Sequence, residues 1–207
     1  MIIHNIEQGT DEWLDLRKGV ASASRFKSLF TPKTMKPSSS MTKYAKELAL
    51  ELAYHSISAG GSFKSAAMIE GNEREPLARK AYQKRTLSLV KEVGFITSDC
   101  GNFGYSPDGL VGDDGLIEIK CLEAEAHSEI LLKGAKEMPD DYKCQVQGGL
   151  WLSERKWCDF VAYGKIKNEE KNLIIIRVFR DEEFIKKLEV EARNCIALRD
   201  EILKQLS

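Results

Sequence analysis

The sequence has few of the features that mark secreted, membrane-spanning or zinc-binding proteins. Its five cysteines are odd in number and no two form a C-x-x-C pair, which favours free thiols in a reducing compartment. No apolar run reaches the roughly 18 to 20 residues that span a bilayer, and the N-terminus lacks the basic and apolar regions of a signal peptide. Only three histidines are present, and they are widely spaced, so we expect no zinc site.

The net charge is also close to zero, because 31 Lys and Arg are balanced by 32 Asp and Glu, which gives a formal charge of -1. Domains that bind nucleic acid are usually basic, so this total alone argues against such a partner. The distribution argues the other way. Arg17 to Lys46 holds eight basic residues and no acidic one, which leaves -9 on the rest of the chain. We therefore expect salt-dependent contact with nucleic acid, confined to one basic surface.

Length and composition indicate one ordinary globular domain. The 207 residues are 43% hydrophobic and 30% charged, which excludes a disordered or collagen-like chain. We expect a single domain, 1–207, with a basic helical part at about 1–60, a core at about 61–180 and a C-terminal helix at about 181–205.

Hydrophobic periodicity predicts an α/β (α+β) fold. Pro76 is expected to kink its helix or to begin the second half of that helix. Helices are predicted near 10–30 and over 41–57, 66–85, 123–133, 139–153 and 181–205. A loop is predicted at 31–40, and strands within 87–96 and over 115–121, 158–165 and 172–179.

The chemically informative segment joins Asp108 to Glu118 and Lys120. Alternation on a strand places Glu118 and Lys120 on one face, although an isolated E-x-K triplet is usually a plain ion pair. Gly112 to Gly115 predicts a turn before this strand. A two-residue loop would turn Asp108 away from Glu118, whereas a three-residue loop would place the two carboxylates opposite each other.

Two adjacent carboxylates repel each other unless a cation lies between them. Oxygen ligands suit Mg²⁺ or Mn²⁺, and a metal-bound water beside Lys120 is a nucleophile suited to a phosphodiester. This is the P-D-x(n)-E-x-K arrangement of the restriction-endonuclease-like nuclease superfamily. The pattern alone is weak, because its residues are few and common.

Further motifs sharpen the comparison, and most of the chain resembles the phage lambda exonuclease family. The segments that carry the resemblance are Glu12-Trp13, Leu16 to Gly19, Ala23-Ser24, Gly71 to Glu75, Ser106 to Leu110, Glu118 to Cys121, and Gln145 to Gln147 with Trp151 beyond. The resemblance implies a restriction-endonuclease-like core, in which helices flank a central mixed sheet.

The resemblance also implies a deoxyribonuclease that digests one strand of linear duplex DNA from 5′ to 3′ and leaves a 3′ single-stranded overhang. Asp108, Glu118, the Ile119 carbonyl and Glu75 would bind two Mg²⁺ ions, for which Mn²⁺ substitutes. Glu75 is preferred over Glu73 because Gly71 fixes the spacing. Lys120 would help to activate the attacking water.

A second implied group is a pocket for the 5′-phosphate, made by Arg17, Ser24 and Ser106. An arginine fork with hydroxyls binds phosphate well, although Ser24 is nearly as well explained as a cap. Gln145 would orient the water or Lys120, the alternative being a surface amide. The tryptophans are interpreted as core residues rather than stacking platforms; they are Trp13, Trp151 and Trp157.

The resemblance also implies a toroidal homotrimer around DNA and a single-strand annealing protein as partner, in a phage- or prophage-encoded system in the cytoplasm of a bacterial host. Pro76 and Gly148-Gly149 depart modestly from the family pattern. Three alternatives stay open: a structure- or site-specific endonuclease of the same superfamily, a non-catalytic DNA-end binder, and an α/β protein whose acid–lysine cluster is only an ion-pair network.

Overall fold

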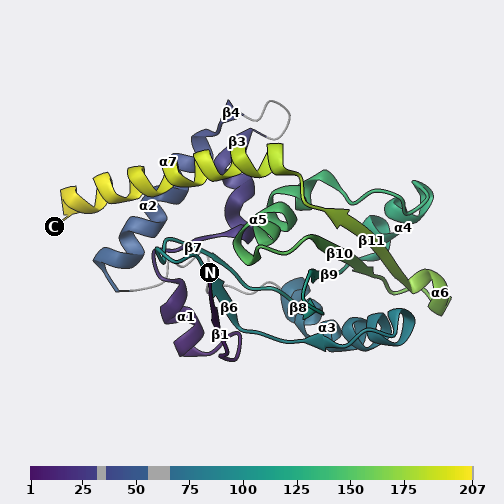
Figure 1. Cartoon of the computed structure of the whole chain (residues 1–207). Coiled ribbons are helices and arrows are strands. Elements are labelled where there is room, and N and C mark those ends of the chain that lie inside the picture. Colours follow the sequence, from purple (N-terminus) through teal and green to yellow (C-terminus); the bar gives the residue numbers. More distant parts are fainter. Residues whose placement is uncertain (32–35, 56–65, 207) are drawn as a thin grey trace.

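The computed structural model describes residues 1–31, 36–55 and 66–206, which form two sheets flanked by helices (Figure 1). The larger sheet has the strand order β11-β10-β9-β8-β5, in which β9 and β10 run parallel and the other neighbours antiparallel. Its strands are β5 (Val90–Lys91), β8 (Gly109–Val111), β9 (Gly115–Cys121), β10 (Trp157–Tyr163) and β11 (Leu173–Phe179). The predicted mixed sheet between helices is confirmed.

The smaller sheet has the order β1-β6-β7-β2 and joins the N-terminus to the middle of the chain. Its strands are β1 (Ile2–His4), β2 (Ala21–Ser22), β6 (Phe95–Thr97) and β7 (Phe103–Tyr105). The segment expected to be a loop at 31–40 instead contains two short paired strands, β3 (Phe30–Thr31) and β4 (Lys36–Pro37). The centre of that loop and the helix end expected at Gly60-Gly61 lie outside the described residues.

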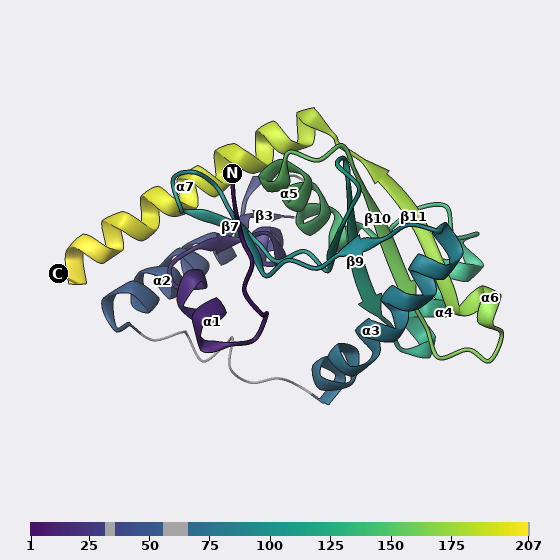
Figure 2. The same cartoon turned by 60° about the horizontal axis from the view of Figure 1, so that its bottom comes forward.

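Helices cover both faces of the larger sheet. Helix α3 (Ala66–Thr86) lies across one face (Figure 2). Its Ala78 and Tyr82 pack in one cluster with Ile117 and Ile119 of that face. The opposite face packs against Ile130 of α4 and against α5. The helices on this side are α4 (Ala124–Leu132) and α5 (Lys143–Ser153). Two short helical segments lie in connections: the 3-10 helix η3 (Asp140–Tyr142) and α6 (Glu169–Asn172).

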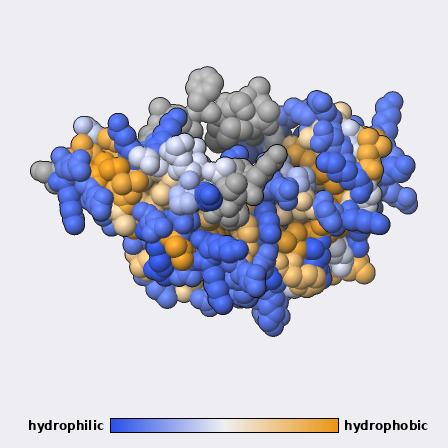
Figure 3. Space-filling view, turned by 90° about the horizontal axis from the view of Figure 1, so that it is seen from above, coloured by the Kyte–Doolittle hydropathy of each residue, from blue (hydrophilic) through white to orange (hydrophobic). Residues whose placement is uncertain are grey.

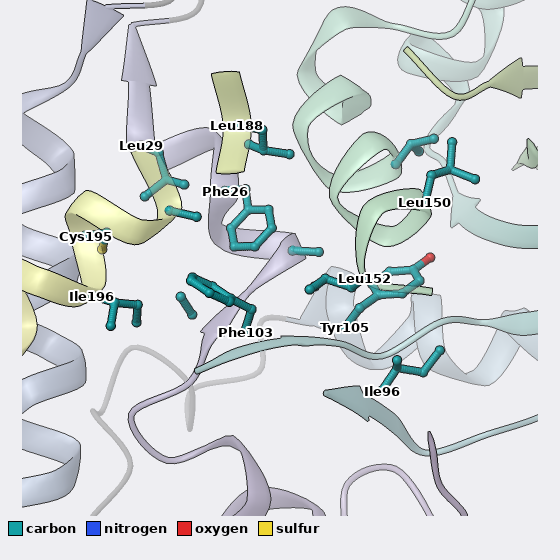
Figure 4. Close-up of a cluster of buried hydrophobic side chains, with 14 of the residues drawn as sticks. Phe26, Leu29, Ile96, Phe103, Tyr105, Leu150, Leu152, Leu188, Cys195 and Ile196 are labelled. Carbon is teal, nitrogen blue, oxygen red and sulfur yellow. The ribbon is translucent and has the colours of Figure 1, made fainter. Parts of the chain in front are cut away.

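The main core lies between α2 (Ser39–Ala53), α5 and α7 (Glu182–Leu206) and the smaller sheet. Figure 4 shows Phe26, Phe103, Leu150 and Leu188 converging there from four elements. On the α7 side the surface is mostly hydrophilic (Figure 3). No helix of the described residues is long and apolar enough to cross a membrane.

The helix predicted near 10–30 is wrong beyond its first turns. Helix α1 (Asp11–Arg17) begins at Thr10, whose side chain caps the Trp13 N–H, and it ends before Gly19. Gly19 has φ +69°, and a Cβ there would lie 2.4 Å from a Leu52 carbon. The chain then forms β2 and the 3-10 helix η1 (Ala23–Leu29), because parallel pairing of β2 with β7 overrides helical propensity. The N-terminal part is therefore mixed rather than helical.

The other predicted elements occur close to their expected bounds. Helix α3 continues through Pro76, strand β9 has the predicted bounds, and α7 differs by one residue at each end from the helix expected at 181–205. The strands expected within 87–96 are short, and the second continues to Thr97. All five cysteines are free thiols, as predicted.

The hairpin of β8 and β9 has the three-residue loop. Val111 pairs with Gly115 and Gly109 with Ile117, so extending this register by one residue beyond β8 places Asp108 opposite Glu118. Arg155 clamps this turn, since one guanidinium nitrogen donates to the carbonyls of Gly112 at 2.8 Å and Gly115 at 2.7 Å. The turn and its clamp set which face of the sheet each carboxylate occupies.

Candidate active site

Glu118 is the centre of the site, and its side chain is almost fully buried, at 1% exposure. Three elements supply its hydrogen-bond donors. Tyr105 of β7 donates its hydroxyl to Oε2 at 2.7 Å, and Lys120 of β9 donates to Oε1 at 2.7 Å. The Gln145 amide of α5 also donates to Oε1. Gln145 is thus a member of the buried cluster rather than a surface amide.

Asp108 lies beside Glu118, and its Oδ2 accepts a hydrogen bond from the backbone N–H of Ile119. Burial raises the pKa of Asp108 well above its usual value, and the neighbouring Glu118 carboxylate raises it further. The Lys120 ammonium and the Ile119 N–H act in the opposite direction. The structure therefore brings together three of the predicted catalytic residues and leaves their negative charge incompletely balanced.

Glu75 approaches the same cluster from α3. Burial raises the pKa of its carboxyl, Arg79 partly offsets this, and the Glu118 charge adds to the rise. Glu73 is exposed to solvent, and Glu70 pairs with Lys165 at 2.6 Å. The carboxyl of Glu75, in contrast, interacts electrostatically with both Glu118 and Lys120.

Arg79 connects two of the acidic residues. Its guanidinium pairs with Glu75, donates to the Asp108 carbonyl oxygen at 3.1 Å, and pairs with Glu92 at 2.9 Å. One cation thus fixes the α3 carboxylate relative to Asp108, the residue just before β8. Sequence reasoning missed Arg79, although the i, i+4 spacing from Glu75 on a helix is a signal for such a pair.

Lys120 carries a strongly held positive charge. Burial alone would lower the pKa of its ammonium, but Glu118 and Asp108 outweigh this effect and raise the pKa above its usual range. The ammonium also lies 5.5 Å from the centre of the Tyr142 ring. A lysine in this state supplies positive charge and hydrogen bonds at neutral pH.

The donor set is compatible with a hard divalent cation. Asp108 and Glu118 form a close carboxylate pair, but within 1–31, 36–55 and 66–206 no group of three His, Cys, Asp or Glu side chains is gathered closely enough to hold a metal ion, so Glu75 would have to move toward this pair. The Ile119 carbonyl would add an oxygen to the carboxylates of Asp108, Glu118 and Glu75, and oxygen ligands suit Mg²⁺. A cation between these acids would relieve the repulsion that raises the pKa of Asp108 and of Glu75.

Of the predicted phosphate-binding residues, Arg17 and Ser106 are in direct contact, and Arg17 and Ser24 line the same cavity. Arg17 donates to Ser106 Oγ at 3.0 Å, and its guanidinium stacks on the Trp13 ring at 4.2 Å. Burial lowers the pKa of Arg17, which still remains a cation at neutral pH. Ser24 is not a helix cap, because Ser22 occupies the cap position of η1, 3.3 Å from Ser24 Oγ.

One cavity of about 1220 Å³ joins the two groups, since Arg17, Ser24, Glu75 and Asp108 all line it. A smaller hollow of about 280 Å³ lies beside it. Ser24 borders both, and the other residues around the smaller one are Lys27, Asp141, Tyr142 and Gln145. One residue pair from each predicted group therefore shares a concave surface, while Ser106, Glu118 and Lys120 lie behind its lining.

Trp13 does not fit the predicted core role. It lines the cavity, and its indole N–H donates to Gly94 O and to Ser106 Oγ, both at 3.1 Å. Trp151 and Trp157 do pack against core clusters. The missed signal was the i, i+4 spacing of Trp13 and Arg17, which places both side chains on one face of α1.

The basic segment is partly neutralised by acidic residues that flank it in the sequence. Lys18 pairs with Asp15, and Arg25 pairs with Glu47 at 2.6 Å. Lys36, Lys43 and Lys46 are exposed, while Lys33 lies outside the described residues. The net positive charge of this surface is therefore lower than the sequence of residues 17–46 alone predicts.

Comparisons with known proteins agree with this geometry. The family model of the YqaJ-like viral recombinase domain matches residues 12–156. An alkaline exonuclease (LHK-Exo) from Laribacter hongkongensis is 35% identical, with a TM-score of 0.84, and the match covers 95% of this chain and 96% of that one. The same values hold for its complex with dAMP. No curated protein matched.

A phage-related exonuclease from Haemophilus somnus 129PT shares the fold, at 16% identity and a TM-score of 0.67, over 91% of this chain and 96% of that one. Helix-flanked sheets with an acidic pair and a lysine on the central hairpin define a nuclease-type α/β domain. The chain belongs to the family of YqaJ-like viral recombinase domains, which is the phage lambda exonuclease family.

Proposed function

We propose that the protein is a metal-dependent exonuclease that hydrolyses one strand of linear double-stranded DNA from 5′ to 3′ and leaves a 3′ overhang. The observation that carries this proposal is the single cavity lined by both Arg17 and Asp108. The alkaline exonuclease at 35% identity supports an exonuclease activity. Its complex with dAMP supports a deoxynucleoside monophosphate as product.

Recognition of the DNA end begins at Arg17, Ser24 and Ser106. The Arg17 guanidinium and the two hydroxyls offer charge-assisted hydrogen bonds to a terminal 5′-phosphate. An end held there places the first phosphodiester toward Asp108 and Glu75, in the other part of the cavity. A pocket that fits a chain terminus explains both the preference for ends and the 5′→3′ direction.

Asp108, Glu118, Glu75 and the Ile119 carbonyl would hold two Mg²⁺ ions, which Mn²⁺ can replace. When bound, these ions neutralise charge on the scissile phosphate and lower the pKa of a coordinated water. Tyr105, Lys120 and Gln145 hold the Glu118 carboxylate in place. Lys120 and Gln145 also carry N–H donors that can orient the attacking water.

The reaction is hydrolysis, and its atoms balance without a further reactant. The water oxygen bonds to phosphorus, the bond from phosphorus to the 3′ oxygen of the terminal nucleotide breaks, and that oxygen takes up a proton. The products are a nucleoside 5′-monophosphate and a strand with a new 5′-phosphate. Because each cut regenerates the group that Arg17 binds, the pocket suits repeated cleavage of one strand.

The assembly is proposed to be a homotrimer that encloses duplex DNA, with the exposed lysines of 36–46 facing the phosphates. The remaining 3′-ended strand would be passed to a single-strand annealing protein in the cytoplasm of a bacterial host. Membership of the viral recombinase family supports this role in recombination.

Degradation of a 5′-phosphorylated duplex in Mg²⁺ tests the chemistry. We expect Asp108→Ala and Lys120→Ala each to slow cutting by roughly 10²- to 10³-fold or more, while binding to DNA ends survives. Asp113→Ala is the matched control, because this exposed carboxylate lies in the turn of the same hairpin. Full activity in Asp108→Ala would rule out the proposed site.

A further inference from the structure

Ser106 has an unusual set of hydrogen-bond partners. Its Oγ accepts one bond from the Trp13 indole nitrogen at 3.1 Å and another from the Arg17 guanidinium at 3.0 Å. Indole and guanidinium nitrogens donate and do not accept, so the direction of both bonds is certain.

Two accepted bonds use both lone pairs of a serine hydroxyl, so only its O–H remains available. Within the described part of the chain, no protein atom accepts a hydrogen bond from Ser106. The hydroxyl is therefore a donor that lacks an acceptor, bonded to an arginine that lines the cavity. A phosphate is a matching ligand, because its oxygens accept without needing to donate.

Trp13 fixes this arrangement through two contacts. Its indole N–H is shared with the Gly94 carbonyl at 3.1 Å, which anchors the ring just before strand β6. The same ring carries the Arg17 guanidinium at 4.2 Å, and Phe95 lies 5.4 Å from that guanidinium. Trp13 thus contacts both partners of the proposed pocket.

We propose that Trp13 is a positioning residue for recognition of the terminal 5′-phosphate. Its indole N–H obliges Ser106 to donate toward the ligand, and its ring holds Arg17 in the same pocket. This inference rests on the proposed phosphate pocket and adds a specificity determinant to it. A site that offers only donors favours a phosphorylated end over a 5′-hydroxyl end.

Trp13→Phe separates the two contacts, because phenylalanine keeps a ring for Arg17 and removes the indole N–H. Ser106→Ala removes the hydroxyl itself. Trp151→Phe is the matched control, since that indole ring packs on Phe26 and Phe103 away from the pocket. The double variant Trp13→Phe/Ser106→Ala shows whether Trp13 acts through Ser106.

The measurement is fluorescence anisotropy in EDTA, with a duplex labelled at its far end and carrying either a 5′-phosphate or a 5′-hydroxyl. We expect the wild type to prefer the phosphorylated end. Trp13→Phe should reduce the affinity ratio roughly three- to tenfold, which is the net effect of one ordinary hydrogen bond. The double variant should match Ser106→Ala, and Trp151→Phe should match the wild type.

Three results overturn the inference. They are an unchanged ratio in Trp13→Phe, an equal loss of affinity for both ends, and a further loss of preference in the double variant beyond Ser106→Ala. A wild type without preference would overturn the pocket and the inference together. A clear preference in EDTA combined with no digestion in Mg²⁺ would count against the exonuclease alone and would still support the role of Trp13.

Discussion

Val111 of β8 pairs with Gly115 of β9, which leaves three residues for the turn between the strands. Extended by one residue beyond β8, this register places Asp108 opposite Glu118, on the side of the sheet that carries Lys120. A turn shorter by one residue would point Asp108 to the other face, because side chains alternate along a strand. The acidic site therefore depends on the length of one turn.

Arg155 is expected to be the residue that maintains this turn. Replacement by methionine removes the donor to the exposed Gly112 carbonyl and to the carbonyl of Gly115, which is buried and would be left without this partner. We expect a loss of about 1–3 kcal/mol in the free energy of unfolding, measured by urea denaturation, together with reduced nuclease activity.

The matched control for Arg155 is its neighbour Lys156, which is exposed and pairs with Asp114 at 2.9 Å. Lys156→Met should change the free energy of unfolding by less than about 1 kcal/mol, because exposed ion pairs contribute little. Equal effects of the two substitutions would show that Arg155 does not clamp the turn.

Tyr105 is expected to support the chemistry through Glu118. Tyr105→Phe keeps the buried ring and removes the hydroxyl that donates to Oε2, so one oxygen of a buried carboxylate loses its donor. We expect the free energy of unfolding to fall by about 1–3 kcal/mol and kcat to fall more than KM changes. Tyr54→Phe, at an exposed tyrosine, is the control. A KM effect without a kcat effect would contradict this role.

The sequence was sufficient to predict the site wherever local pattern determines structure. Alternation placed Glu118 and Lys120 on one face, and Gly112 to Gly115 marked the turn, although two loop lengths remained possible. The three-residue loop that forms is hydrogen-bonded by Arg155, which lies about forty residues further along the chain. No local pattern reveals a side chain that reaches back to main-chain carbonyls.

The features that sequence analysis missed share a tertiary cause. The helix expected near 10–30 ends early because β2 pairs with β7. Helical propensity depends on local sequence and does not include a strand partner from a distant part of the chain. Trp13 lines the cavity, where its indole N–H donates to the carbonyl of Gly94, the residue just before β6. Tyr105 reaches Glu118 from the other sheet. Each of these contacts joins segments that only the complete fold brings together.

His127 gives the fold a testable pH dependence. Burial lowers the pKa of its imidazole from 6.5; a hydrogen bond with the Asn172 backbone opposes this shift, and the Arg74 charge adds to it. Its Nε2 is buried without a partner among the described residues. As pH falls below about 6.5, the unfolded chain binds the proton first, so this contribution to stability is complete above that pH and is lost below it.

The comparison is between wild type and His127→Phe, by urea denaturation at pH 7.5 and 5.5. The variant keeps a ring against Gly164 and should lose less stability on acidification, by up to about 1.4 kcal/mol per pH unit. Taking the difference between the two proteins cancels the titration of the acidic site. Equal losses in both would contradict a depressed pKa, and the exposed His55→Gln serves as control.

The most direct test of the central proposal follows labels on DNA during digestion in Mg²⁺. Three substrates are compared: a linear 5′-phosphorylated duplex labelled at the 5′ end, the same duplex labelled at the 3′ end, and a covalently closed circle. We expect the 5′ label to leave first as a mononucleotide, the 3′ label to stay on a long strand, and the circle to stay intact. Cutting of the circle as fast as the linear duplex, or early release of the 3′ label, would contradict a 5′→3′ exonuclease.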